Sequence, residues 1–529
     1  MKETIYDSVI IGGGIAGLTA GYMLRDKNIL LLEKEKRFGG RVESERVHEA
    51  TNNIGTQFFT EEDTSFVRLV NELGIERVTH DTGSVPMALH LNNKLYTSFG
   101  SLFSPGVVLE ALRFVSKIYR KLKIFKLSMD DPRWKELAAQ DASVFQKGFS
   151  PKLMGLVNAY MRGACVSKLE RTSAGMGAHL AGDIFQTGKM AFVTGGFQRI
   201  TDSMAERLEG KAISGAEVTR VEEKDGIVTT WFNKDGKEQI VSSKSAVMAM
   251  QPELAVKVLP NLPVKKKEAM EKVLYGPITI ISVFLKRPIP WKRFYMGLSD
   301  SLIFQGVGDA TFDTEEDKNE DNPIIYNFII SITPDEREEI KAFLAKSDEE
   351  IVDLCLKDFK KFMPDADIEK YITGTKVTRY PLGELELSPE YYLDLLPELM
   401  KPVGNIHFCG DYTDPKSFVD GAAYSGMRAA CELGSSYISS VDEIVKFPKE
   451  QKWGAWGWTT MIINLLMVAG GFLLPRGYGA TMSIGAGALL ALTATLPAYF
   501  PPLKPIYKAI FGISVVFGGI VGLLAGLIG

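Results

Sequence analysis

Three glycines near the start of the chain, Gly12, Gly14 and Gly17, have the spacing GxGxxG. In a dinucleotide site the first such glycine makes a tight turn, and the second lets the main chain approach a pyrophosphate. The third allows a helix to pack closely on a strand. Ile15 and Ala16, inside the motif, would open a helix whose amino end offers amide donors and a favourable dipole to the phosphates. The spacing therefore predicts a phosphate-binding turn.

An acidic residue, Glu33, follows this turn at the distance at which dinucleotide sites hold a ribose. Its carboxylate can accept hydrogen bonds from both ribose hydroxyls, and it would repel a 2′-phosphate. Lys34 comes directly after it and is included in the predicted site. Gly40 and Arg41, in a Gly-Gly-Arg run a few residues further on, are included as well.

The elements that must hold these residues follow from the hydrophobic pattern. Residues 6–11 predict a strand, 15–24 a helix, and 29–32 a second strand that ends at Glu33, which makes a β–α–β unit. Residues 62–195 are expected to be mostly helical. Further strands are predicted at 211–223, 226–232, 240–250, 278–285, 322–332, 371–380 and 405–409, and helices at 347–362 and 421–433.

This order of elements predicts an α/β fold with a Rossmann-like cofactor-binding domain, a mixed-sheet and helical substrate domain, and C-terminal transmembrane helices. Both domains are expected to be discontinuous in sequence. The predicted boundaries are 1–62, 196–260 and 400–436 for the cofactor-binding domain, 63–195 and 261–399 for the substrate domain, 437–452 for a linker, and 453–529 for a membrane anchor.

The anchor is predicted from three windows without a charged residue, 453–475, 477–503 and 509–529. A helix needs about 20 apolar residues to cross a bilayer, and each window meets that length. Lysines gather before the first window and between the second and third, so the large N-terminal body is expected on the cytoplasmic side. The C-terminus would then lie outside. The N-terminus shows no signal-peptide pattern, which also favours a cytoplasmic catalytic domain.

Composition excludes several classes of function. The formal net charge is −4, which gives no reason to expect a nucleic-acid partner. The four cysteines are scattered without a CxxC pair, and the five histidines have no metal-ligand spacing, so neither a metal site nor a disulfide framework is predicted.

Two further motifs lie far downstream, at 403–411 and 418–422. Together with the glycine turn, the acidic residue and the Gly-Gly-Arg run, they resemble the flavin-containing amine oxidase superfamily. That superfamily includes monoamine oxidases, protoporphyrinogen oxidases and phytoene desaturases. The resemblance implies that the cofactor is FAD, with Arg41 near its pyrophosphate. It covers residues 6 to about 436 and leaves the membrane tail outside.

The resemblance implies roles for residues outside the turn. Gly410 and Asp411 would meet the ribityl–phosphate chain. Val419 and Ala422 would lie at the start of a helix that faces the pyrimidine edge of the isoalloxazine, where the helix dipole stabilises negative charge. Val218 would hold the adenine through its backbone.

Thr56 lies in the segment that resembles the one passing near the flavin. Other positions depart from the monoamine oxidase pattern. Monoamine oxidases tether the flavin to a cysteine before the last strand, but this chain has no cysteine between Cys355 and Cys409, so noncovalent FAD is predicted. Ile280 stands where those enzymes have a lysine near flavin N5, and Phe418 replaces one tyrosine of their aromatic cage.

These departures favour hydride transfer to flavin N5 from a hydrophobic carbon substrate, as in protoporphyrinogen oxidases or carotenoid desaturases. The predicted function is thus a membrane-bound FAD oxidoreductase whose partners are a lipophilic small molecule, membrane lipid, and oxygen or a quinone as electron acceptor. Three alternatives stay open: a flavin amine oxidase that produces hydrogen peroxide, a flavin-dependent isomerase, and a non-enzymatic binding protein resembling GDP-dissociation inhibitors. No catalytic side chain is assigned.

Overall fold

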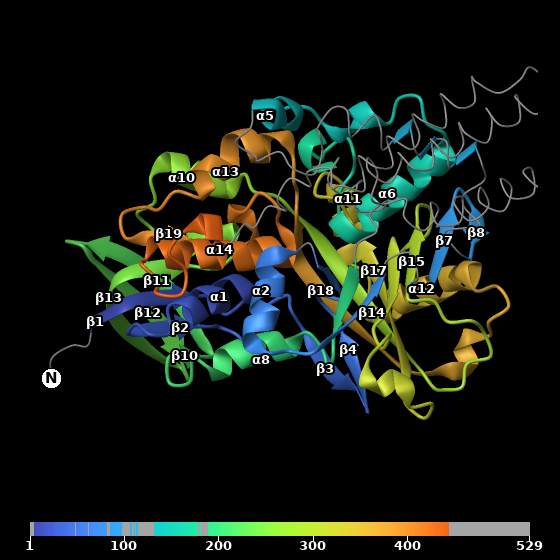
Figure 1. Ribbon diagram of the computed structural model, residues 1–529, viewed down its shortest axis with the longest axis horizontal. Coiled ribbons are helices and arrows are strands. Elements are labelled where there is room, and N and C mark those ends of the chain that lie inside the picture. Colours follow the sequence, from blue (N-terminus) through green and yellow to red (C-terminus); the bar gives the residue numbers. More distant parts are fainter. Residues whose placement is uncertain are drawn as a thin grey trace, which may run out of the picture. The chain divides into compact units, whose positions relative to one another are not determined.

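The predicted β–α–β unit is present in the computed structural model as β1 (Ile5–Ile11), α1 (Ile15–Met23) and β2 (Ile29–Leu32) (Figure 1). All residues of α1 and β2 are buried, as expected for elements at the centre of an α/β layer structure. Gly12, between β1 and α1, has a φ of +109°, which a residue with a side chain rarely adopts.

The structure describes residues 5–81, 85–97, 132–177 and 189–443, except 48 and 62, with a few positions between 106 and 114 and at 180. The three predicted transmembrane windows lie outside these residues. Within the described ranges, no helix is long and apolar enough to cross a bilayer. Almost all described residues belong to one unit formed by 1–80, 85–181 and 190–446.

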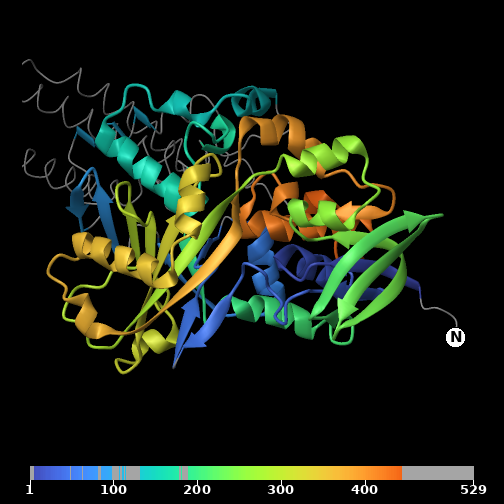
Figure 2. The same cartoon turned by 180° about the vertical axis from the view of Figure 1, so that it is seen from behind.

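The first sheet has the strand order β10-β2-β1-β13-β12-β11, and β19 pairs with β13. Strands β10, β2, β1, β13 and β19 run parallel, whereas β11 and β12 are antiparallel additions at one side (Figure 2). The further bounds are β10 (Ala212–Ile213), β11 (Ala216–Lys224), β12 (Ile227–Lys234), β13 (Lys237–Met248) and β19 (Ile406–Phe408).

Two loops shape this sheet. Asp235 and Gly236 both have positive φ, 51° and 73°, and form the two-residue turn of the hairpin between β12 and β13. The single strand predicted at 211–223 is interrupted, because Gly215 (φ +67°) turns the chain between β10 and β11.

Helices α2 (Thr64–Leu73), α8 (Gln198–Glu206) and α14 (Phe418–Glu432) pack with α1 around a common apolar core. The contact between α1 and α14 is close, because a side chain at Gly426 would overlap the main-chain oxygen of Ala16. The amino ends of α1, at Ile15, and α14, at Phe418, both belong to this layer, so motifs from opposite ends of the described chain are held by one core.

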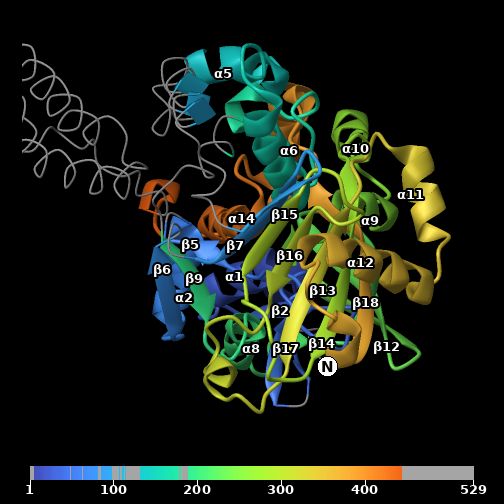
Figure 3. The same ribbon diagram turned by 90° about the vertical axis from the view of Figure 1, so that its right-hand side faces the viewer.

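The second sheet has the order β18-β14-β17-β16-β15-β7-β8. Helix α12 (Asp348–Phe362) covers one face of it, where Phe359 and Phe362 pack with Phe328 (Figure 3). The strand bounds are β7 (Met87–Leu91), β8 (Lys94–Tyr96), β14 (Tyr275–Leu285), β15 (Met296–Ser299), β16 (Gly306–Asp309), β17 (Ile324–Ser331) and β18 (Ile372–Leu385).

Two of these strands are longer than the sequence predicted. Strand β14 begins at Tyr275 rather than 278, and β18 continues to Leu385 rather than ending at 380. Pro277 and Pro381 interrupt the apolar pattern, but an irregularity in the pairing between Gly276 and Ile278 accommodates them. The added residues form part of the candidate site.

The described parts of residues 62–195 contain strands as well as the predicted helices, and these strands are too short to show a clear period in the sequence. They include β7 and β8, β6 (Arg77–Asp81) and β9 (Lys189–Val193), which pairs with β5 (Phe59–Thr60). The remaining elements are β3 (Ser44–Val47), β4 (Ala50–Asn53), α5 (Pro132–Ala138), α6 (Pro151–Cys165), α9 (Pro252–Val258), α10 (Val264–Glu271), α11 (Arg337–Leu344) and α13 (Leu396–Leu399).

Candidate functional site

The three glycines of the turn have different surroundings. A Cβ atom at Gly12 would lie 2.6 Å from the main-chain oxygen of Ala249, and one at Gly17 would overlap the oxygen of Gly12. A Cβ atom at Gly14 would meet nothing within 4 Å. Two glycines thus let the turn form, while the third leaves open space over the start of α1, where Ile15 and Ala16 are the first helical residues.

Glu33 lies at the end of β2 with 8% of its surface exposed. One carboxylate oxygen accepts a hydrogen bond from the amide of Gly13 (2.6 Å), and the other accepts one from the amide of Glu35 (2.8 Å). Its main-chain oxygen accepts from Ala216 at the start of β11 (2.8 Å), which places Val218 on the neighbouring strand. The side chain of Lys34 is about half exposed and contacts Glu35, so only its backbone is close to the turn.

The Gly-Gly-Arg run folds back onto the glycine turn. The amide of Gly39 donates to the oxygen of Gly13 (2.8 Å), and a Cβ atom at Gly40 would lie 3.4 Å from the Cα of Gly14. Both Gly39 and Gly40 have positive φ, 116° and 57°. The two glycine motifs therefore lie side by side, as a site for a pyrophosphate requires.

Arg41 contacts two segments that lie far from it in the sequence. Its guanidinium lies 2.9 Å from the carboxylate of Asp411 and donates to the main-chain oxygen of Gly383 (2.7 Å). The hydroxyl of Tyr275 donates to the other carboxylate oxygen of Asp411 (3.0 Å). Only 5% of the Asp411 side chain is exposed, compared with 36% for Arg41, so the arginine has the more accessible face.

A second acid, Glu384, lies in the same cluster. Its carboxyl accepts a hydrogen bond from the hydroxyl of Ser417 (3.4 Å). Burial raises the pKa of Glu384 to about 8, with Asp411 adding to the effect and Arg41 opposing it. Tyr275 and Glu384 were not assigned to the site from sequence, because Pro277, just after Tyr275, and Pro381, just before Glu384, interrupt the strand pattern of their segments.

The turn that leads into α14 is held by buried contacts. The amide of Gly410 donates to the hydroxyl of Ser425 (2.9 Å), and Arg428 donates to the oxygen of Phe408 (2.7 Å). Ser417 and Phe418 have positive φ, 57° and 56°, which is a strained backbone for residues with side chains. Helix α14 begins at Phe418, earlier than the predicted 421, and its first turns carry Val419 and Ala422, which pack against the core around α1.

Ile280 and Thr56 belong to the side of the site formed by the second sheet. Ile280 is 3% exposed, and Ser282, two residues along β14, shares its face of the strand. Ser282 accepts a hydrogen bond from Asn52 on β4 (3.0 Å). Ile280 therefore faces the segment that leads from β4 to Thr56, whose neighbour Gly55 has no room for a side chain beside the oxygen of Arg41.

These residues fit an FAD molecule. The open space over Gly14, the exposed face of Arg41 and the helix amino ends suit the anionic pyrophosphate, and the carboxylates of Glu33 and Asp411 suit sugar hydroxyls. All predicted residues except the Lys34 side chain lie in or beside this arrangement, and their roles stay predictions. No cluster of acids, histidines or cysteines suited to a metal ion occurs in the described part of the chain.

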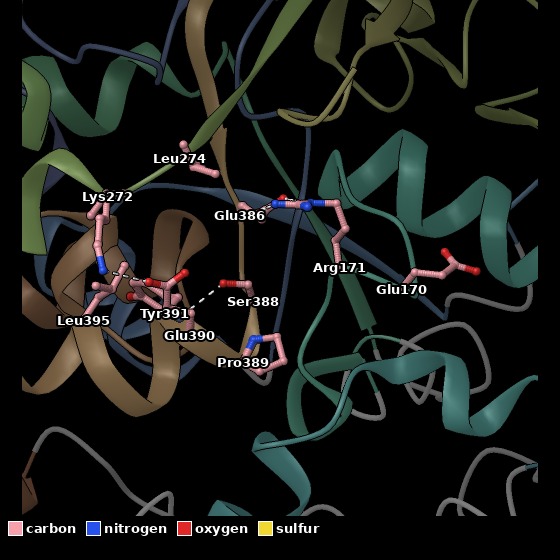
Figure 4. A pocket seen from close by; sticks show the side chains of 11 residues that line it. Glu170, Arg171, Lys272, Leu274, Glu386, Ser388, Pro389, Glu390, Tyr391 and Leu395 are labelled. Carbon is pink, nitrogen blue, oxygen red and sulfur yellow. Dashed lines mark hydrogen bonds and ion pairs between the residues drawn. The ribbon is translucent and has the colours of Figure 1, made fainter. Parts of the chain in front are cut away.

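A cleft of about 190 Å³ lies next to the cluster, at the ends of β14 and β18 (Figure 4). Leu274 and Glu386 line it and flank Tyr275 and Glu384 in the sequence. Glu386 forms a two-pronged ion pair with Arg171 across the cleft. The rest of its lining is a second ion pair, Lys272–Glu390, and mostly neutral side chains, and none of the predicted cofactor-binding residues lines it, so it is not itself the predicted cofactor site.

Comparisons with known proteins agree with this geometry. The family model for flavin containing amine oxidoreductases matches residues 15–434. The chain is 24% identical to a probable flavin-containing monoamine oxidase A from Dictyostelium discoideum, over 83% of this chain and 99% of that protein. It is 23% identical to putrescine oxidase from Kocuria rosea, over 82% of this chain and 97% of that protein.

Solved structures have the same fold. Wild-type putrescine oxidase bound to putrescine has a TM-score of 0.66 at 19% identity, over 82% of this chain and 99% of that one. Cyclohexylamine oxidase from Brevibacterium oxydans has a TM-score of 0.66 at 16% identity, over 83% of this chain and all of that one. The chain therefore belongs to the flavin-containing amine oxidoreductase family, as the motifs indicated, and is an FAD-dependent oxidoreductase.

Proposed function

We propose that this protein is an amine oxidase that transfers a hydride from the α-carbon of an amine to noncovalently bound FAD. The amine becomes an imine, which water hydrolyses, and oxygen takes up the two electrons and two protons as hydrogen peroxide. The family match over residues 15–434 carries this proposal, because the relatives named above are amine oxidases. It replaces the dehydrogenation of a lipophilic carbon substrate as the leading hypothesis.

When bound, the flavin supplies the two-electron acceptor, and the protein binds and orients. In this proposal Glu33 holds the ribose, Arg41 and the amino end of α1 bind the pyrophosphate, and Asp411 holds the ribityl chain. The amino end of α14, which begins at Phe418, stabilises negative charge on the pyrimidine edge. Ile280 presents an apolar surface that excludes water from the reacting carbon.

Anaerobic bleaching of the flavin tests the proposal. Purified protein is mixed with primary amines, diamines, porphyrinogens and polyenes, and the flavin absorbance is followed. We expect bleaching by at least one class of amine, and hydrogen peroxide on readmission of air. Bleaching by a porphyrinogen or polyene but by none of the amines would contradict it.

A second candidate is the dehydrogenation of a lipophilic substrate with oxygen or a quinone as acceptor. Ile280 and Phe418, which replace the lysine and a tyrosine of the monoamine oxidase pattern, favour this candidate. The three uncharged windows after residue 452 support a membrane location for it, with membrane lipid around the anchor and the catalytic domain in the cytoplasm. The predicted division into cofactor-binding and substrate domains belongs to both candidates.

The proposed anchor can be tested apart from the chemistry. Removal of residues 453–529 should release flavin-containing protein from membranes into the soluble fraction, with flavin content unchanged. Retention of unaggregated, truncated protein on membranes would contradict an anchor located only in these residues.

A further inference from the structure

Glu384 is a partly buried acid that the proposed chemistry does not use. It lies on β18 next to Gly383, whose oxygen accepts from Arg41, and Ser417 donates to its carboxyl. The charged and titratable groups that act on it are Arg41, from the Gly-Gly-Arg run, and Asp411, after β19. Tyr275, on β14, adds a neutral hydroxyl that donates to Asp411.

The cluster has two acids but one cation. Arg41 forms an ion pair with Asp411 (2.9 Å) and donates a hydrogen bond to the oxygen of Gly383 (2.7 Å). Tyr275 donates to the remaining carboxylate oxygen of Asp411. Among the described residues, Glu384 forms no ion pair, and its carboxyl accepts one long hydrogen bond, from Ser417 (3.4 Å). A second carboxylate in such a place would be a partly buried charge without a partner of opposite sign, which is unfavourable.

We propose that Glu384 acts in its neutral, protonated form as a positioning residue of the cofactor site, leaving the charge of Arg41 to Asp411 and to the FAD pyrophosphate. The inference rests on the binding of FAD at this site. Ionised Glu384 would compete for Arg41 and would add a negative charge near an anionic cofactor, so FAD binding should favour the protonated protein.

The pH dependence follows from this linkage. Burial raises the pKa of Glu384 to about 8 in the protein without cofactor. Below that pH the acid is already protonated, and FAD affinity should be flat. Above it, binding requires uptake of a proton, so the dissociation constant of FAD should rise by up to about tenfold per pH unit.

The experiment measures the dissociation constant of FAD from flavin fluorescence between pH 6 and 9.5, on full-length apoprotein in detergent. Glu384→Gln keeps the shape and neutrality of the protonated acid. We expect it to bind FAD like the wild type at pH 6.5, and to lack most of the loss of affinity above pH 8. Glu386→Gln, two residues along the same segment, is the matched control, and its profile should follow that of the wild type.

Two outcomes would overturn the proposal. If Glu384→Gln folds but binds FAD at least tenfold more weakly than the wild type at pH 6.5, the acid acts as a carboxylate. If its profile above pH 8 runs parallel to that of the wild type, another group titrates.

Thermal melting of the apoprotein is a second readout. The stability that Glu384 contributes is present at acidic pH and falls between about pH 4.5 and 8. The stability of Glu384→Gln relative to the wild type should therefore rise over that range. Failure of both proteins to bind FAD would instead refute the cofactor assignment.

Discussion

The glycine turn and the second-sheet side of the site are built in different ways. At Gly12 and Gly17 the close contacts are with main-chain oxygens, those of Ala249 and Gly12, so lack of space dictates a glycine at both positions, which lie close together in the sequence. On the other side, Asn52, Ser282 and Asn327 form a side-chain network that joins strands far apart in the chain. The first kind of site leaves a motif in the sequence, and the second leaves only isolated polar residues in apolar strands.

The largest expected effect comes from the glycine turn. Gly17→Val would drive a side chain into the oxygen of Gly12, so α1 must move. We expect the unfolding free energy to fall by about 3 kcal/mol or more, and the protein to lose its bound flavin. Gly14→Ala is the matched control: its φ of −74° suits alanine and its Cβ meets no protein atom. It should melt like the wild-type apoprotein and bind FAD more weakly. Equal melting temperatures for Gly17→Val and wild type would contradict the close packing.

The network on the other side should be nearly as sensitive. Asn327 donates to the side chain of Asn52 (3.0 Å) and to the oxygen of Asn53 (2.7 Å), and it accepts from Ser282 (2.7 Å). Asn327→Leu would leave these buried groups unpaired and should cost about 2–4 kcal/mol, measured by denaturant unfolding. Asn261→Leu, at the surface, should change stability by less than about 0.5 kcal/mol. Similar values for both variants would show that the network adds little.

Glu33 combines the two kinds of contact, because its side-chain carboxylate accepts a hydrogen bond from the main-chain amide of Gly13 in the glycine turn. Glu33→Ala should weaken FAD binding by about 10- to 100-fold, since it removes charge-assisted hydrogen bonds to the ribose. The change is measured by flavin fluorescence titration. Glu35→Ala, at an exposed neighbour, should leave the affinity unchanged. Unchanged occupancy in Glu33→Ala would remove the ribose role of this residue.

The smallest effect is expected where the two sides meet. Tyr275→Phe removes the hydrogen bond to Asp411 and should lower unfolding free energy by about 1 kcal/mol and weaken FAD binding slightly. Tyr295→Phe removes a buried hydroxyl that has no hydrogen-bond partner among the described residues, so it should be neutral or slightly stabilising. If both variants behave alike, Tyr275 does not hold Asp411 in place.

The sequence predicted the β–α–β unit and the last strand and helix, because their apolar periods are long and their motifs are short-range. It placed Glu33, Arg41 and Asp411, and the structure brings Arg41 and Asp411 into contact. It did not assign Tyr275 or Glu384 to the site. Pro277 and Pro381 interrupt the apolar pattern just inside the two strand ends, and only the irregular pairing of β14 with β18 accommodates them. The proximity of Tyr275 and Glu384 depends on strand pairing across 109 residues, which local periodicity cannot report.

The central claim is that FAD binds at this site without a covalent bond. Protein purified in detergent is precipitated with acid, and the flavin absorbance of the supernatant and the pellet is read. The account predicts yellow protein that releases its flavin into the supernatant, because no cysteine lies between Cys355 and Cys409. Flavin retained in the washed pellet, or a folded protein that neither carries nor takes up FAD, would contradict it.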